Sequence, residues 1–133
     1  MISYTFTARG HLHIRATHPT TLEFTRDTQL TTRGNCIAGV GADFALGKLK
    51  GFLTQKLVRI LIQAGDAQDA VSAQPNPLFS DGHELVIRTT DFGSARTFAT
   101  GATKAARDLP RSLVERLKDP DATITVTIEA ADG

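Results

Sequence analysis

Cysteine and large aromatic residues are scarce in this sequence of 133 residues. Cys36 is the single cysteine, which excludes an internal disulfide and a zinc site made of cysteines alone. Tryptophan is absent and aromatic residues make up 6% of the chain, so few side chains are available to stack on nucleic-acid bases. No apolar run approaches the roughly 18–20 residues of a membrane-spanning helix, and the first residues lack the basic and apolar regions of a signal peptide. We therefore expect a soluble, cytoplasmic protein with no membrane partner.

The composition is typical of one folded domain, with 41% hydrophobic and 22% charged residues, and we expect a single domain over residues 1–133. The net charge of +1 is unevenly divided. Residues 1–66 carry eight Lys or Arg against four Asp or Glu, a net +4, whereas residues 67–133 carry seven against ten, a net −3. A basic half attracts phosphates or nucleic acid, but oppositely charged halves also attract each other within one fold. Both interpretations stay open on the sequence alone.

The two halves of the sequence resemble each other at a spacing of about 65 residues, which predicts an internal duplication. Four pairs of segments align in the same order: 41–49 with 101–109, 58–64 with 124–130, 22–24 with 85–87 and, weakly, 4–8 with 69–73. We therefore predict a first unit over about residues 2–65 and a second unit over about residues 67–131.

Each unit is predicted to contain three strands, a helix and a fourth strand. Alternation of apolar and polar residues predicts the strands, and leucines at helical spacing predict the helices. In the first unit these are strands 4–8, 21–25, 35–40 and 58–64, with a helix over 46–57 that Gly47 and Gly51 weaken. In the second unit they are strands 69–73, 85–89, 96–100 and 123–130, with a helix over 109–117.

The predicted fold class is α+β and rich in strands. One helix cannot cover both faces of four strands, so two such units have to pack on one core. Two units related by a pseudo-twofold axis can form a closed or nearly closed barrel, which also removes exposed strand edges. An α+β sandwich is the alternative.

The two units differ most in two loops of the first unit. Residues 9–20 contain three histidines and two arginines, and the corresponding residues 74–81 contain none. The first unit also has four extra residues within 28–36. Because duplicated halves share core positions for packing reasons, we expect the functional surface where one half departs from the other.

The histidines suggest a divalent metal site. In an extended segment His11 and His13 would point to the same face, and His-x-His is a workable pair of ligands. Side chains that could complete the ligand set are His18, Cys36, Asp43 and Asp27. The alternative is that these histidines bond to the backbone in turns.

Arginines and threonines around the same histidines suggest instead an anion site. Guanidinium groups and hydroxyls suit a phosphate or a carboxylate. No Walker or dinucleotide-binding glycine motif is present, so a specific nucleotide is not implied. The candidate ligand-binding residues are Arg9, His11, Arg15, Thr17, His18, Thr20, Arg33, Asn35, Cys36 and Asp43.

Cys36 has two interpretations of its own. It could act as a nucleophile with a nearby histidine as base. Its neighbours Ile37 and Val40 favour a small buried core residue instead.

Several stretches together resemble DUF371, an archaeal family without an established activity. They are Arg9-Gly10-His11, Arg15-Ala16-Thr17-His18, residues 20–25, Thr31-x-Arg33-Gly34-x-Cys36-Ile37 and residues 104–110. The resemblance covers essentially the whole chain and implies an archaeal cytoplasmic protein. Two positions depart from the family pattern: Leu12 stands where proline is frequent, and Asn35 stands where aspartate is frequent. The second departure removes a carboxylate from the candidate site and weakens the metal hypothesis.

We interpret the sequence as a small ligand-binding or regulatory module with an anion-binding polar site in its first unit. One alternative is a small hydrolase-like or metal-assisted enzyme that uses His11 and His18. The other is a nucleic-acid-associated barrel that uses the basic half. No cofactor is strongly implied, and the sequence assigns no catalytic residue and no oligomeric state.

Overall fold

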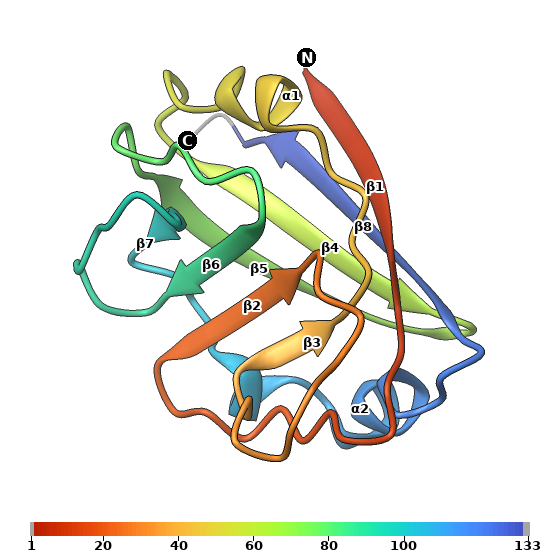
Figure 1. Ribbon diagram of the computed structural model, residues 1–133. Helices are drawn as coiled ribbons and strands as arrows, with labels where there is room; N and C mark the ends of the chain where they lie inside the picture. Colours follow the sequence, from red (N-terminus) through yellow and green to blue (C-terminus); the bar gives the residue numbers. More distant parts are fainter. Residues whose placement is uncertain (1, 132–133) are drawn as a thin grey trace.

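The computed structural model describes residues 2–131, in which eight strands alternate with three short helical segments (Figure 1). The strands are β1 (Ser3–Arg9), β2 (Thr21–Thr25), β3 (Ile37–Gly39), β4 (Val58–Ala64), β5 (Ala67–Pro75), β6 (Glu84–Arg88), β7 (Thr97–Thr100) and β8 (Thr123–Ala130). The helices are α1 (Leu46–Lys50), the 3-10 helix η1 (Ala106–Asp108) and α2 (Arg111–Leu117). None of the helices in this part of the chain is long and apolar enough to cross a membrane.

Alternating side chains place the strands as the sequence predicts. In β4, Val58, Ile60 and Ile62 are fully buried, whereas the residues between them are exposed or half-buried. This period of two directs one face of each strand to a common core and the other face outward. Strand β8 follows the same pattern. The predicted bounds of 58–64 and 123–130 match β4 and β8.

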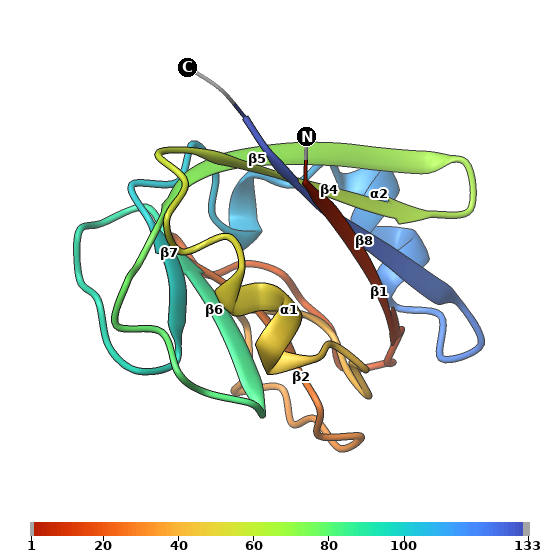
Figure 2. The ribbon, with the colours of Figure 1, turned by 90° about the horizontal axis from the view of Figure 1, so that it is seen from above.

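All eight strands belong to one curled sheet in the order β1-β8-β4-β5-β7-β6-β2-β3. Strand β5 links its two parts, because residues 67–73 pair with β4 while Gln74 and Pro75 pair with β7. Figure 2 shows the two parts facing each other across the core. In both views α1 lies across one end of this arrangement and α2 lies toward the other end (Figures 1 and 2).

The α+β, strand-rich class is confirmed, but the strand pairing does not close the sheet into the predicted barrel. The end strands β1 and β3 form no ladder within residues 2–131. They meet at one isolated bridge, in which the Arg9 N–H donates to the Val40 carbonyl (2.7 Å) and the Val40 N–H donates to the Arg9 carbonyl (2.9 Å).

The first predicted helix is too long. Helix α1 covers only Leu46–Lys50, and turns occupy the following residues up to β4. Gly51 is its C-terminal cap. Gly47 and Gly51 lower helix propensity, so the leucine spacing alone does not extend the helix. Leu53 still packs on the core, although it lies in a turn.

The two units contain matching backbone features. The parallel pairs β2–β3 and β6–β7 both carry a register irregularity. Gly41 and Gly101 have left-handed φ angles of 56° and 58°. The residue after each glycine donates its N–H to the last carbonyl of β2 or of β6, at 2.9 and 3.0 Å. These matches support the predicted duplication, which itself stays a prediction.

Replacing Gly41 or Gly101 by alanine should destabilise the fold by about 1–2 kcal/mol each, because an L-residue strains at these φ angles. An added Cβ has room at both positions, with its nearest neighbour at 3.4 Å at Gly41 and at 3.8 Å at Gly101. The loss of stability therefore comes from the backbone conformation and not from a steric clash. Gly47→Ala is the matched control. No atom lies within 4 Å of a Cβ at this helical position, so this variant should gain roughly 0.5 kcal/mol.

Urea unfolding of the three variants measures these changes in free energy. If Gly41→Ala were as stable as the wild type, the backbone conformation at this position would not strain an L-residue.

Candidate functional site

The first of the two predicted loops, residues 10–20, is an ordered connection without a strand. The His11 N–H donates to the Leu117 carbonyl (3.0 Å), and the Arg111 guanidinium donates to the Ala16 carbonyl (3.0 Å). Ile14 and Ala16 are fully buried. The loop therefore follows α2 closely and turns at residues 12–13 instead of being extended, and the rings of His11 and His13 lie side by side with their centroids 5.2 Å apart.

The histidine rings of this loop bond to the backbone. Nδ1 of His11 accepts the N–H of His13 (3.0 Å), and Nδ1 of His18 accepts the N–H groups of Thr20 (3.1 Å) and Thr21 (3.0 Å). A neutral imidazole that accepts at Nδ1 carries its proton on Nε2, so neither nitrogen offers a free lone pair to a metal. Across residues 2–131, no three His, Cys, Asp or Glu side chains are arranged to hold a metal ion. The geometry supports the alternative in which these histidines stabilise turns.

The two predicted loops do meet. The Asn35 carbonyl accepts the N–H groups of Thr17 (2.9 Å) and His18 (3.2 Å), which joins residues 10–20 to the loop before β3. Asp43 lies elsewhere, along the free edge of β1, where its carboxylate accepts the N–H (2.8 Å) and the hydroxyl (3.0 Å) of Thr7.

The three predicted arginines remain separate side chains at the surface. Arg9, Arg15 and Arg33 are exposed. Within the described part of the chain, no hydrogen bond or ion pair engages any of their guanidinium groups. Arg9 belongs to the end of β1, whereas Arg15 and Arg33 belong to the two loops. A shared anion site on these three residues therefore stays a prediction.

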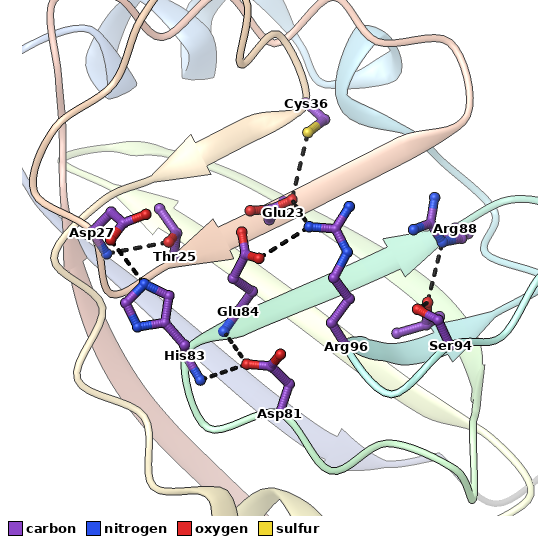
Figure 3. Close-up of polar contacts among 11 residues, drawn as sticks. Glu23, Thr25, Asp27, Cys36, Asp81, His83, Glu84, Arg88, Ser94 and Arg96 are labelled. Carbon is purple, nitrogen blue, oxygen red and sulfur yellow. Dashed lines mark hydrogen bonds and ion pairs between the residues drawn. The ribbon is translucent and has the colours of Figure 1, made fainter.

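A different group of polar side chains lies on the outer side of β2 and β6, which pair antiparallel at the middle of the second sheet part (Figure 3). Leu22 and Phe24 of β2 point into the core, so the residues between them point to the other side. We call this surface the polar face. Its members are Thr21, Glu23, Thr25, Cys36, Glu84, Arg88, Ser94, Arg96 and Thr97.

Glu23 is the buried centre of the polar face, with only 4% of the residue exposed. Burial, followed by a hydrogen bond that protonated Glu23 donates to the neighbouring Glu84 carboxylate, raises the pKa of Glu23 to about 8. The Arg96 guanidinium opposes this shift, but its nearest nitrogen lies 4.0 Å from the Glu23 carboxylate. At neutral pH Glu23 therefore carries a proton.

Glu84 and Arg96 form the outer, partly exposed layer of the cluster. Nη1 of Arg96 donates to Oε1 of Glu84 at 3.0 Å. The hydrogen bond with Glu23 and the contact with Arg96 lower the pKa of Glu84, although partial burial opposes them. The two carboxyl groups thus differ in charge at neutral pH, and such separated pKa values mark candidate functional sites.

A tight turn holds the first residue of β6 in place. Oδ1 of Asp81 accepts the N–H groups of His83 (2.7 Å) and Glu84 (2.9 Å). The His83 ring in turn contacts the Asp27 carboxylate at 2.8 Å. These contacts, drawn in Figure 3, join the start of β6 to the end of β2.

Cys36 closes the cluster from the loop before β3. Its thiol donates to Oε1 of Glu23 at 3.7 Å. Burial and the nearby Glu23 carboxyl group raise the pKa of the Cys36 thiol to about 12. Because the thiolate is the nucleophile, a thiol that stays protonated does not support the nucleophile interpretation.

Arg88 lies at the other end of the polar face without a carboxylate partner. Its Nε donates to the Thr97 hydroxyl (3.1 Å) and its Nη1 donates to the Thr21 hydroxyl (3.4 Å). The guanidinium lies 5.1 Å from the ring centre of Phe92, whose exposed fraction is 60%. No ion pair engages Arg88 among residues 2–131. Two hydroxyls and an aromatic ring thus orient a half-buried cation whose charge is not neutralised.

Most of the polar face was not predicted from the sequence, because polar residues that alternate with apolar ones in a strand normally lie on its solvent-facing side. Only Cys36 was among the predicted site residues, while His18 and Thr20 lie next to the face through their contacts with Thr21. One signal was available in the duplication itself. Glu23 aligns with Val86 of the second unit, so a carboxyl group replaces an apolar residue at an otherwise shared position.

The family model described as "Domain of unknown function (DUF371)" matches residues 6–131 of this chain. The chain is also similar to the uncharacterized protein MJ0206 of Methanocaldococcus jannaschii. The two are 31% identical over 119 residues, which cover 84% of this chain and 88% of the relative.

Replacing Glu23 by glutamine should abolish a loss of stability that occurs as the pH rises from 4.5 to 8. The pKa of Glu23 rises on folding from 4.5 to about 8, so the folded state keeps a proton that the unfolded state has lost in this window. The free energy of unfolding of the wild type therefore falls as the pH rises from 4.5 to 8 and levels off above 8. Relative to Glu23→Gln, the wild type should lose up to about 5 kcal/mol between pH 4.5 and pH 9, since one pKa unit corresponds to about 1.4 kcal/mol.

Urea unfolding at pH 5, 7 and 9 tests this difference. Glu115→Gln, at an exposed position of α2, is the matched control and should follow the wild type. A Glu23→Gln variant with the same pH dependence as wild type would show that Glu23 titrates normally.

Proposed function

This chain belongs to the DUF371 family, a domain of unknown function, and from its polar face we propose that it is a binding module for a small molecule with an anionic group. The anionic group, a carboxylate or a phosphate, binds at Arg88. The observation that carries this proposal is the arrangement of Arg88: half-buried, oriented by two hydroxyls and free of any carboxylate partner within the described chain.

An oriented guanidinium is a suitable anion site for two reasons. A planar fork of N–H donors matches the oxygens of a carboxylate or phosphate. The neighbouring hydroxyls hold this fork in place before the ligand arrives, which lowers the entropic cost of binding. Arg96 differs in this respect, because Glu84 already neutralises it.

The hydroxyls of Ser94, Thr97 and Thr21 provide further hydrogen-bonding groups around Arg88. The Ser94 and Thr97 hydroxyls lie 3.1 Å apart. Thr21 adjoins Thr20, whose hydroxyl lies 3.5 Å from its own. The proposed site thus combines residues of both units, with Thr20 as the contribution of the predicted first-unit loop.

The finer fold assignment, a nearly closed barrel whose end strands β1 and β3 approach each other, is part of this proposal. It is supported by the Arg9–Val40 bridge and by the Asp43 carboxylate, which accepts the next free N–H along the edge of β1. Strand β5 joins β7 by a comparably short stretch. A ring of this kind would keep β2 and β6 rigid and so fix the polar face.

The two other hypotheses have less support. Nδ1 of His11 and Nδ1 of His18 accept backbone N–H groups, which disfavours the metal-assisted enzyme. For nucleic-acid binding, the exposed Arg15 and Arg33 are the candidates, but no element presents them as a cluster. Both arginines therefore serve as controls in the experiment below.

Millimolar sulfate should raise the melting temperature of the wild type by a few degrees, and Arg88→Gln should lose this rise. A ligand that binds only the folded state stabilises it by mass action, by about 1.4 kcal/mol at ten times the Kd. Sulfate also stabilises proteins non-specifically, so the difference between variants at equal ionic strength is the readout.

Arg33→Gln and Arg15→Gln are matched controls, because both remove an exposed arginine from a loop. They should keep the sulfate response. An undiminished response in Arg88→Gln would refute the anion site at Arg88. A response lost in Arg15→Gln or Arg33→Gln would instead place the anion site in the first-unit loops.

A further inference from the structure

We propose that anion binding at Arg88 is coupled to a proton shared by Glu23 and Glu84, so that the polar face binds an anion while the pair holds this proton and releases it when the proton is lost. This inference rests on the proposed function and adds its regulation. It also predicts that the ligand enters together with a proton at mildly alkaline pH.

Strand register brings the two sites close together. Thr21 of β2 pairs directly with Arg88 of β6, and Glu23 pairs with Val86. Glu23 and Arg88 are therefore diagonal neighbours on one face of an antiparallel pair, at about 7–8 Å. At this separation, the charge on Glu23 changes the affinity of Arg88 for an anionic ligand.

The charges of the cluster require a shared proton. Two carboxyl groups, Glu23 and Glu84, face a single guanidinium, that of Arg96. The Glu23 side chain is 5% exposed, so water does not compensate a second negative charge there.

The other groups that face this pair do not supply the missing positive charge. Cys36, on the loop before β3, contributes a neutral thiol that donates to Glu23. Asp81, in the turn before β6, adds a negative charge near Glu84. His83 is engaged by Asp27 at the exposed end of the strands. Arg88 is then the nearest remaining cation on the polar face.

The two protonation states differ in what Arg88 presents to a ligand. With the proton in place, Glu84 and Arg96 cancel, and Arg88 is a free cation. Without it, the pair adds one negative charge that faces Arg88 and repels an incoming anion. At about 8 Å and an effective dielectric constant of about 20 this charge weakens the binding of a monovalent anion roughly 30-fold, which salt screening reduces to about fivefold. For the two charges of sulfate the screened effect is about 20-fold, and roughly tenfold of it is reached by pH 9.

Titration of the protein with sulfate at pH 6.5 and pH 9 tests the coupling. Sulfate and arginine keep their charges over this range, whereas Glu23, with a pKa of about 8, loses its proton. The Kd for sulfate should rise about tenfold in the wild type and less than twofold in Glu23→Gln. Calorimetry at pH 8 in buffers of different ionisation enthalpy should show uptake of about half a proton per sulfate in the wild type and none in the variant.

Glu84→Gln provides a second, independent variant. With Glu84 neutral, Arg96 is free to pair with Glu23, so the pH dependence between 6.5 and 9 should again disappear. This variant gives the same readout if Glu23→Gln does not fold, as judged by circular dichroism.

The outcomes separate the two proposals. Sulfate binding that depends on Arg88 but not on pH, without proton uptake, would overturn the coupling and leave the anion site intact. Absence of sulfate binding at both pH values would overturn the proposed function and the coupling with it. A pH dependence unchanged in both glutamine variants would assign the proton to another group and refute the role of the pair.

Discussion

The antiparallel pairing of β2 with β6 is the interaction on which the rest of this molecule depends. These strands come from different halves of the chain, and each is flanked by its own parallel partner, β3 or β7. Their inner faces supply Leu22, Phe24, Leu85 and Ile87 to the core. Their outer faces carry the polar cluster. One ladder therefore joins the two units, completes the core and positions the candidate site.

Burial decides the electrostatics of that site. An exposed glutamate on a strand would titrate normally, but Glu23 is covered from above by Arg96 and at its side by Cys36. A buried carboxyl group without full compensation keeps its proton. The same enclosure that makes Cys36 a poor nucleophile makes Glu23 an acid at neutral pH. Within the polar face, Arg88 has hydroxyls as its partners and keeps an unbalanced charge.

The loops of the first unit have a structural role in addition to any contact with ligand. His11 and His18 bind backbone N–H groups, and Arg111 binds the carbonyl of Ala16, a buried residue with a positive φ of 50°. A loop of this kind needs internal acceptors because its backbone groups have no strand partners. The histidines and the neighbouring arginine of α2 supply part of these bonds. Two of the three clustered histidines, His11 and His18, thus stabilise the backbone of this loop.

Sequence periodicity alone determined most of the strand positions and the α+β class, because side-chain alternation is a local property. It overestimated the first helix, since glycines and local turns outweigh the leucine pattern there. The polar face was decided only by the tertiary structure. A glutamate between Leu22 and Phe24 looks the same in sequence whether its side of the strand faces water or a covering arginine. Its burial, its proton and its distance from Arg88 depend on which strands pair, and strand pairing is a non-local property.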